Sequence, residues 1–297
     1  FFWLIKSSSR GCCAEQAAQE TQQHTPATMV RDGDAEIFDT PEAVEAKVRR
    51  LAEMVRQSHG KCVVFTGAGL STSAGIPDFR GPQGVWTLKA KGLAPKRGVD
   101  TCKAAPTLGH RAVKELLDRG VFAHCVSQNV DGIHRRSGVP EEKLSELHGN
   151  TNLERCERCG VSYFRETSTR RHSNHVHDHY TGRSCKDVRC GGRLLDSIVN
   201  FGESLPEREW GKAERAFRDA ELCVVLGSSC RVTPAASLPE KLAHAPGKRL
   251  VIVNLQETPL EGVADLCISA STDDVLRLLL QHLEEAVPSR APTVGHC

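Results

Sequence analysis

Short apolar runs alternate with stretches of helical periodicity along this chain, and no other feature constrains its fold as strongly. The apolar runs cover residues 62–65, 121–126, 222–226 and 250–253. Around them, apolar residues recur every three or four positions, as at 44–55, 210–220 and 275–283. Thr40 followed by Pro41 predicts the start of the first helix. Apolar strands that alternate with helices predict an α/β fold, a doubly wound, Rossmann-like parallel sheet covered on both faces, whose ligands bind beyond the carboxyl ends of the strands.

The composition is that of a globular, water-soluble protein. Of the 297 residues, 39% are apolar and 26% are charged, which argues against wholesale disorder. The 39 basic and 37 acidic side chains leave a net charge of +2, so the overall charge predicts no polyanionic partner. No apolar run approaches the roughly 20 residues of a membrane-spanning helix, and we expect no membrane partner. Residues 1–38 and 288–297 are expected to form a flexible arm and a flexible tail.

The spacing of the cysteines points to a metal site. Four of the 13 form two close pairs, Cys156 with Cys159 and Cys185 with Cys190. This spacing is typical of metal binding rather than of a disulfide framework, and it indicates a reducing compartment. Four thiolates suit one tetrahedral Zn²⁺ with no vacant position, so we predict a structural zinc site. In an alternative, one cysteine is replaced by a histidine from the group His172, His175, His177 and His179.

A glycine-rich loop follows the first apolar run. Gly67 and Gly69 would let backbone amides approach a pyrophosphate, and we expect the N-terminus of a helix just beyond them. A dehydrogenase would need a third glycine at position 72 and an acidic residue about 20 positions further on. Thr72 and Gly92 stand there instead, so the loop favours nucleotide binding without hydride transfer.

Seven ordered blocks resemble the sirtuins, the NAD-dependent protein deacylases. The blocks are 67–71, 75–81, 128–131, 148–150, 201–203, 227–229 and 254–256. The resemblance extends over residues 40–287, and the stretches 81–86 and 181–183 resemble the nuclear class IV branch. It implies an NAD-binding domain from 39–150 and 199–287, which contains a cofactor loop and accessory helical piece at 79–105. It also implies an inserted zinc-binding module at 151–198.

The resemblance further implies a site at the strand ends. His148 is expected to be the general base, since a histidine titrates near neutral pH and can accept a proton from a ribose hydroxyl, and Asn129 is expected to share in catalysis. The acyl-lysine oxygen would attack the ribose carbon and give an alkylimidate, which leads to free lysine and O-acyl-ADP-ribose. The residues expected to bind NAD⁺ are Gly67, Ala68, Gly69, Thr72, Ile76, Asp78, Phe79, Arg80, Trp86, Gln128, Asn129, Asp131, Gly227, Ser228, Ser229, Asn254, Leu255, Gln256 and Thr272. The substrate peptide is expected to add as a strand beside Val199, Phe201, Gly202 and Glu203.

The expected function is therefore NAD-dependent removal of acyl groups from protein lysine, with histone tails as substrates, chromatin as a partner and the nucleus as the compartment. The cytoplasm is the alternative location. Two other functions remain open: mono-ADP-ribosyl transfer to a protein, and an NAD-dependent chromatin scaffold with feeble catalysis. Acidic acyl groups are not expected as substrates, because relatives that accept them use a tyrosine near the acyl channel, and Tyr163 and Tyr180 both fall in the zinc module.

Overall fold

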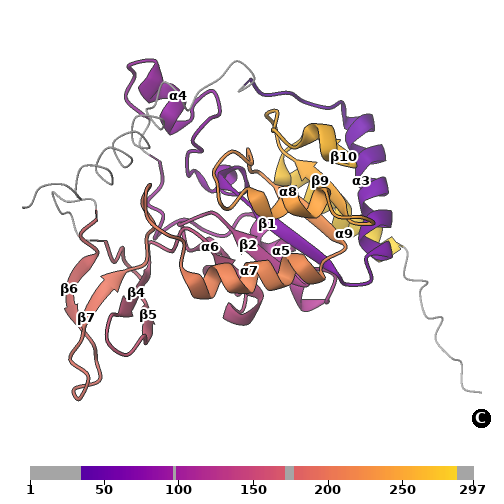
Figure 1. Ribbon diagram of the computed structural model, residues 1–297. Coiled ribbons are helices and arrows are strands. Elements are labelled where there is room, and N and C mark those ends of the chain that lie inside the picture. Colours follow the sequence, from indigo (N-terminus) through magenta and orange to yellow (C-terminus); the bar gives the residue numbers. More distant parts are fainter. Residues whose placement is uncertain (1–34, 96–97, 171–176, 286–297) are drawn as a thin grey trace, which may run out of the picture.

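The computed structural model describes residues 35–95, 98–170 and 177–285. The predicted tail and all but the last four residues of the predicted arm lie outside this part of the chain. Six parallel strands form the main sheet, in the order β10–β9–β8–β1–β2–β3 (Figure 1). They are β1 Cys62–Thr66, β2 His124–Ser127, β3 Leu144–Glu146, β8 Leu222–Leu226, β9 Arg249–Val253 and β10 Leu266–Ile268.

The order of the strands confirms the doubly wound sheet. From β1 the chain adds β2 and β3 on one side, and it then adds β8, β9 and β10 on the other. The switch point of the order therefore lies between β1 and β8, where such sheets bind ligands. The predicted strand at 121–126 starts only at His124, because the amides of Val121 and Phe122 bond instead to Leu116 O at the end of the preceding helix.

Helices cover both faces of the sheet. Alternate side chains of β1 point to opposite faces: Cys62 and Val64 pack under α3 Pro41–Gln57, α5 Leu108–Asp118 and α9 Thr272–Glu285. Val63 and Phe65 pack under α7 Glu207–Asp219 and α8 Ser237–Ala243. The remaining α-helices are α4 Val85–Ala90 and α6 Ile133–Arg136.

The predicted start of the first helix is confirmed, because the Thr40 hydroxyl accepts a hydrogen bond from Ala43 N. None of the helices in the described ranges is long and apolar enough to cross a membrane.

The edge strand β3 is covered by charged side chains of α7. Lys212 Nζ donates to Leu144 O at 2.5 Å, and Glu146 N donates to Glu209 Oε2 at 3.4 Å. Lys212 and Glu209 also form an ion pair with each other at 2.7 Å. The exposed side of β3 therefore has a backbone donor and a backbone acceptor that are both occupied.

A second, smaller sheet is inserted between β3 and α7. It is antiparallel, with the order β5–β4–β7–β6, and Figure 1 shows it at the end of the molecule opposite α3. Its strands are β4 Leu153–Cys156, β5 Ser162–Phe164, β6 Tyr180–Ser184 and β7 Arg193–Asp196. Its buried apolar core consists of little more than Cys156, Cys185 and Leu194. The insertion lies within the predicted module, whose boundaries at 151 and 198 stay predictions.

Candidate active site

Two glycine-bearing loops meet at the switch point, directly beyond β1 and β8. Gly69 N donates to Gly227 O at 2.9 Å, and Gly227 has a φ of 62°, which favours glycine. A Cβ on Gly67 would lie 2.6 Å from Gly227 O, and one on Gly69 would lie 2.7 Å from Gly227 Cα. Only glycines therefore allow the two loops to pack backbone against backbone, and this leaves amide groups accessible beside the strand ends.

The helix expected after this loop is not formed in the described chain, so that expectation was wrong. Residues Ala68–Leu70 and Thr72–Ala74 instead form two short 3₁₀ turns. Gly75 then adopts a φ of 80°, and Pro77 follows, so the chain turns away before an α-helix can continue. A phosphate at this loop would meet individual backbone amides rather than the dipole of a helix.

A cavity of about 480 Å³ opens beside the glycine loops. It lies beyond the carboxyl ends of the strands, as predicted for a ligand site. The cavity brings together nine of the residues predicted to bind the dinucleotide: Gly69, Thr72, Ile76, Asp78, Gly227, Asn254, Leu255, Gln256 and Thr272. Asn254 Nδ2 donates to Gln256 O at 2.8 Å, which fixes the loop after β9 on one wall.

Glu36 also lines this cavity, although nothing in the sequence marked it. Ile37 N donates to Leu255 O at 2.7 Å and Asp39 N donates to Ser269 O at 2.8 Å, so the segment before α3 is bound along the cavity wall. Burial, and secondarily the nearby carboxylate of Asp78, raise the pKa of Glu36. Position 36 falls within the predicted flexible arm, where neither periodicity nor a motif could have identified it.

A third loop, after β2, cross-links the two glycine-bearing loops. Gln128 Nε2 donates to Ser228 Oγ at 2.6 Å, and Asn129 Nδ2 donates to Gly67 O at 2.9 Å. Ser71 Oγ donates to Asp131 Oδ2 at 2.7 Å. The polar residues predicted on three separate segments therefore form one hydrogen-bonded cluster around the strand ends.

His148 lies on the loop after β3 and contacts this cluster. Its Nδ1 lies 3.0 Å from Gln128 O, and because a carbonyl only accepts, Nδ1 carries the hydrogen. In the neutral ring, Nε2 then holds the lone pair that can accept a proton. Burial lowers the pKa of His148, and the hydrogen bond to Gln128 only partly opposes this effect. The ring is therefore neutral at physiological pH and has one basic nitrogen, as a general base requires.

Aromatic side chains gather on the other side of the glycine loops. The rings of Phe79 and Trp86 lie 4.7 Å apart, and those of Trp86 and Phe201 lie 6.1 Å apart. The Arg80 guanidinium stacks over Trp86 at 4.5 Å and donates to Ser229 Oγ at 3.2 Å. These contacts bring four of the predicted residues, Phe79, Arg80, Trp86 and Ser229, next to the predicted peptide segment.

The segment predicted to pair with the substrate peptide is not a strand here. Val199 N donates to His148 O at 3.0 Å, but residues 201–203 turn, and Glu203 N donates to Asn200 O at 3.1 Å. The Glu203 carboxylate accepts from Asn200 N at 2.7 Å, which stabilises the turn. An added strand could therefore begin beside Val199, whereas pairing along Phe201, Gly202 and Glu203 would require the turn to open.

The four predicted metal ligands meet in the small sheet. The sulfur atoms of Cys156, Cys159, Cys185 and Cys190 all lie within 4.8 Å of one another. Cys156 Sγ lies 3.6 Å from Cys190 Sγ, and Cys159 Sγ lies 3.7 Å from Cys185 Sγ. Tetrahedral zinc with Zn–S bonds of about 2.3 Å would separate its sulfur ligands by about 3.8 Å, so the cluster fits a zinc ion with no open position.

The alternative of a histidine ligand is not favoured by the positions of His177 and His179. His179 Nδ1 lies 3.1 Å from Asp196 Oδ1, and its Nε2 lies 3.0 Å from Glu203 Oε1. His177 Nδ1 lies 2.5 Å from Glu203 Oε1. His172 and His175 lie outside the described residues.

Comparisons with known proteins agree with this geometry. A sequence model described as "Sir2 family" matches residues 93–234. The NAD-dependent protein deacetylase Sirt6 of Drosophila melanogaster is 39% identical over 264 residues, which are 86% of this chain and 81% of that protein. The NAD-dependent protein deacetylase sirtuin-7 of Bos taurus is 42% identical over 260 residues, 85% of this chain and 64% of that protein.

A solved structure described as "Sir2-p53 peptide-NAD+" has a TM-score of 0.61 and 30% sequence identity, and the match covers 81% of this chain and 100% of that one. The chain spans about half the length of two plant relatives that it also matches.

Proposed function

The chain belongs to the Sir2 family, and we propose that it is an NAD⁺-dependent protein-lysine deacetylase that transfers the acyl group to ADP-ribose and releases nicotinamide. The observation that carries this proposal is the environment of His148. A neutral imidazole with a basic Nε2 stands at the sheet end, bonded to the loop that cross-links both glycine loops. A hydride-transferring enzyme would need no such base.

The proposed roles follow from where the residues lie. The cavity beside Gly69 and Gly227 would hold the dinucleotide, and the side-chain oxygens of Asp78 and Asn254 would accept from its donors. NAD⁺, when bound, supplies an ADP-ribosyl group on a bond to nicotinamide that breaks readily. His148 would accept a proton from a ribose hydroxyl at Nε2, and Asn129 would hold the sugar close to it. The aromatic rings of Phe79 and Trp86 would keep water from the reacting carbon.

The proposed zinc ion has a structural role. Four thiolates leave no coordination position for a substrate or a reactive water. The small sheet has little core of its own, so metal binding would supply much of its folding free energy.

We further propose acetylated histone tails as substrates, chromatin as a partner and the nucleus as the compartment. The support is the likeness of residues 81–86 and 181–183 to the class IV branch, together with the similarity to sirtuin-7. The cytoplasm remains the alternative compartment.

Incubation with an acetylated histone peptide and NAD⁺ tests the proposal, with nicotinamide release and peptide mass as the measurements. Deacetylation removes an acetyl group from the peptide, ADP-ribosyl transfer adds mass to a protein, and a scaffold with feeble catalysis would release almost no nicotinamide. His148→Ala should lower deacetylation by about 100-fold or more, because general bases contribute that much. His244→Ala, on an exposed helix end, is the matched control. Full activity of His148→Ala would refute the assignment of the base.

A further inference from the structure

We infer that Arg135, Glu146 and Asn150 form a clamp that positions His148 and ties it to the zinc-bearing sheet. The inference rests on the proposed function of His148. The three residues are positioning residues: they contact one another and the backbone around His148, and they need not touch the substrate.

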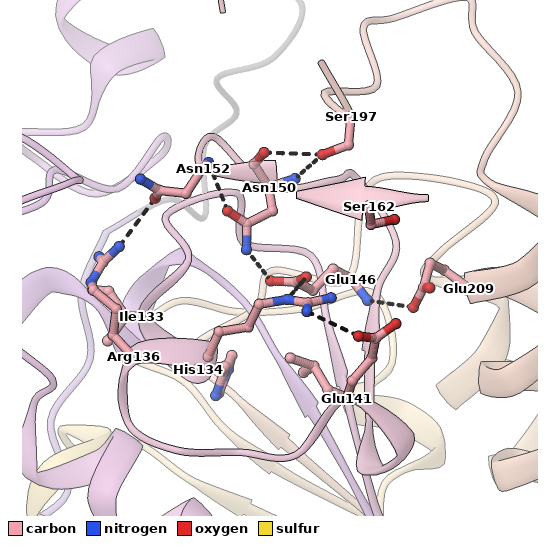
Figure 2. Close-up of polar contacts among 12 residues, drawn as sticks. Ile133, His134, Arg136, Glu141, Glu146, Asn150, Asn152, Ser162, Ser197 and Glu209 are labelled. Atoms are coloured by element: carbon pink, nitrogen blue, oxygen red, sulfur yellow. Dashed lines mark hydrogen bonds and ion pairs between the residues drawn. The ribbon is translucent and has the colours of Figure 1, made fainter. Parts of the chain in front are cut away.

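The clamp is buried and its polar groups are paired. Glu146 is 4% exposed and Asn150 is 0% exposed. Arg135 Nε donates to Glu146 Oε2 at 2.7 Å, and Asn150 Nδ2 donates to Glu146 Oε1 at 2.5 Å. Figure 2 shows Glu146 below Asn150, with a dashed line joining the two side chains. One carboxylate therefore binds two different donors, one from α6 and one from the loop after β3.

Glu146 and Asn150 stand two residues before and two residues after His148. The bond between their side chains closes the short loop that carries the imidazole, and Gly149 N also donates to Glu146 O at 3.2 Å. The ring itself is bonded to the protein at Nδ1, through Gln128 O. The position of Nε2 therefore depends on how firmly the backbone of this loop is fixed.

The same loop is bonded to the end of the small sheet. Asn150 N donates to Ser197 Oγ at 3.0 Å, and Ser197 Oγ donates back to Asn150 O at 3.0 Å, as Figure 2 shows. Val199 N donates to His148 O at 3.0 Å. The segment that leaves the zinc-bearing sheet after β7 is thus bonded on both sides of Gly149.

The clamp also reaches the loop after β2. Asn150 Oδ1 accepts from Asn152 N at 2.8 Å, and Asn152 Oδ1 accepts from Arg136 Nη1 at 3.1 Å. Arg136 Nη2 donates to Asp131 O at 2.8 Å. A change at Glu146 would therefore affect both His148 and the polar loop that holds its Nδ1.

An ion pair in a protein interior is not by itself a sign of a functional role, so the charge environment matters. Burial raises the pKa of Glu146, and the Arg135 guanidinium opposes this effect. Arg135 also contacts a second carboxylate, Glu141, at 3.5 Å, but the Glu141 side chain is 44% exposed and lies away from the His148 loop. The two carboxylates share one arginine and differ in whether they bond to Asn150, which provides a matched pair for a test.

The test exchanges donor and acceptor across the Glu146–Asn150 contact. In Glu146→Gln, the amide can accept from only one of its two donor neighbours, so one contact is lost. In Asn150→Asp, two carboxylates face each other. In the double variant, the new amide at position 146 can accept from Arg135 through its oxygen and donate through its NH₂ group to the new carboxylate at position 150, so complementarity is restored. Glu141→Gln is the control that removes the exposed partner of the same arginine.

We expect each single variant to lower kcat about tenfold or more, since small displacements of a reacting group are costly, while KM for NAD⁺ changes less than about twofold. The double variant should recover kcat to within about threefold of wild type, and Glu141→Gln should behave as wild type. A general loss of folding would not be rescued in this way. Single variants with wild-type kcat, or a double variant no better than the singles, would overturn the inference.

Two further measurements keep the test decisive. If the single variants do not fold, Ser197→Ala removes the bond to the small sheet without changing a charge, and it should lower kcat in the same manner; wild-type kcat in this variant would overturn the inference. NMR of isotope-labelled histidine should show the Nδ1–H form of His148 in wild type and the double variant, and altered ring signals in the single variants. Unaltered His148 signals in the single variants would overturn the clamp. This readout needs no turnover, so inactivity of the wild type would refute the proposed function while the clamp is still tested.

Discussion

Replacing Gly149 by alanine should separate the geometry of the His148 loop from its stability. Gly149 has a φ of 81°, and a Cβ at this position would lie 1.7 Å from Ser197 O, where about 3 Å is the closest tolerable approach. The left-handed conformation alone costs an alanine roughly 1–2 kcal/mol. The clash cannot be relieved by a side-chain rotation, because the opposing atom belongs to the backbone. The loop, and His148 with it, must therefore move by about 1 Å or more.

A displacement of this size at a reacting group can lower the rate by about 100-fold. Gly120→Ala is the matched control, because Gly120 has a φ of 68° and a Cβ there would meet no atom within 4 Å. Both variants should lose the same roughly 1–2 kcal/mol of stability from backbone strain, which corresponds to a fall of several degrees in Tm. Only Gly149→Ala should also lose about 100-fold in kcat.

The assay is deacetylation of an acetylated peptide at saturating NAD⁺, with Tm measured on the same samples. Wild-type kcat in Gly149→Ala would show that the loop absorbs the clash without moving the imidazole. An equal loss of kcat in Gly120→Ala would show that general destabilisation is responsible. Either result would refute the link drawn between Gly149 and His148.

Three further predictions concern protonation and metal. Since burial lowers the pKa of His148 and a base must be neutral, kcat/KM should fall on the acid side only below pH 6.5; a fall centred at pH 7 or above would contradict this. Burial lowers the pKa of His124 to about 4, so between pH 6.5 and 4 only the unfolded chain binds this proton and stability should fall as pH falls, by roughly 1 kcal/mol per pH unit. Urea unfolding should show a shallower dependence in His124→Gln, and an unchanged slope would argue against it. Cys156→Ser should bind less than one equivalent of zinc and lose the small sheet first in limited proteolysis, whereas Cys267→Ser, on β10, should bind zinc as wild type does.

The main sheet was predictable because its strands carry their own signal. The segments 222–226 and 62–65 are buried along their whole length, so an uninterrupted apolar run identifies each one. Strands β3 and β10 have three residues each, which is too short for any pattern to stand out. The residues at the strand ends were found through motifs, and the structure brings most of them to one edge of the sheet.

What could not be predicted depends on contacts between distant segments. The pairing of Arg135 with Glu146 arises because α6 packs against the end of β3, and neither residue differs in sequence from an exposed charge. Glu36 enters the cavity only because Ile37 bonds to Leu255, far along the chain. The two 3₁₀ turns after Gly67 replace an expected helix because of the local conformation of Gly75, which a glycine permits but does not announce.

The charged side chains that cover β3 have a consequence for how this molecule behaves at high concentration. An uncovered outer strand offers its free amides and carbonyls to another chain, and this is a common route to sheet-mediated aggregation. Here Glu209 occupies an amide and Lys212 occupies a carbonyl of that strand, and both bring charge to the rim. A neighbouring molecule would have to displace an ion pair before it could extend the sheet, so the protein carries its own protection against polymerising along this side.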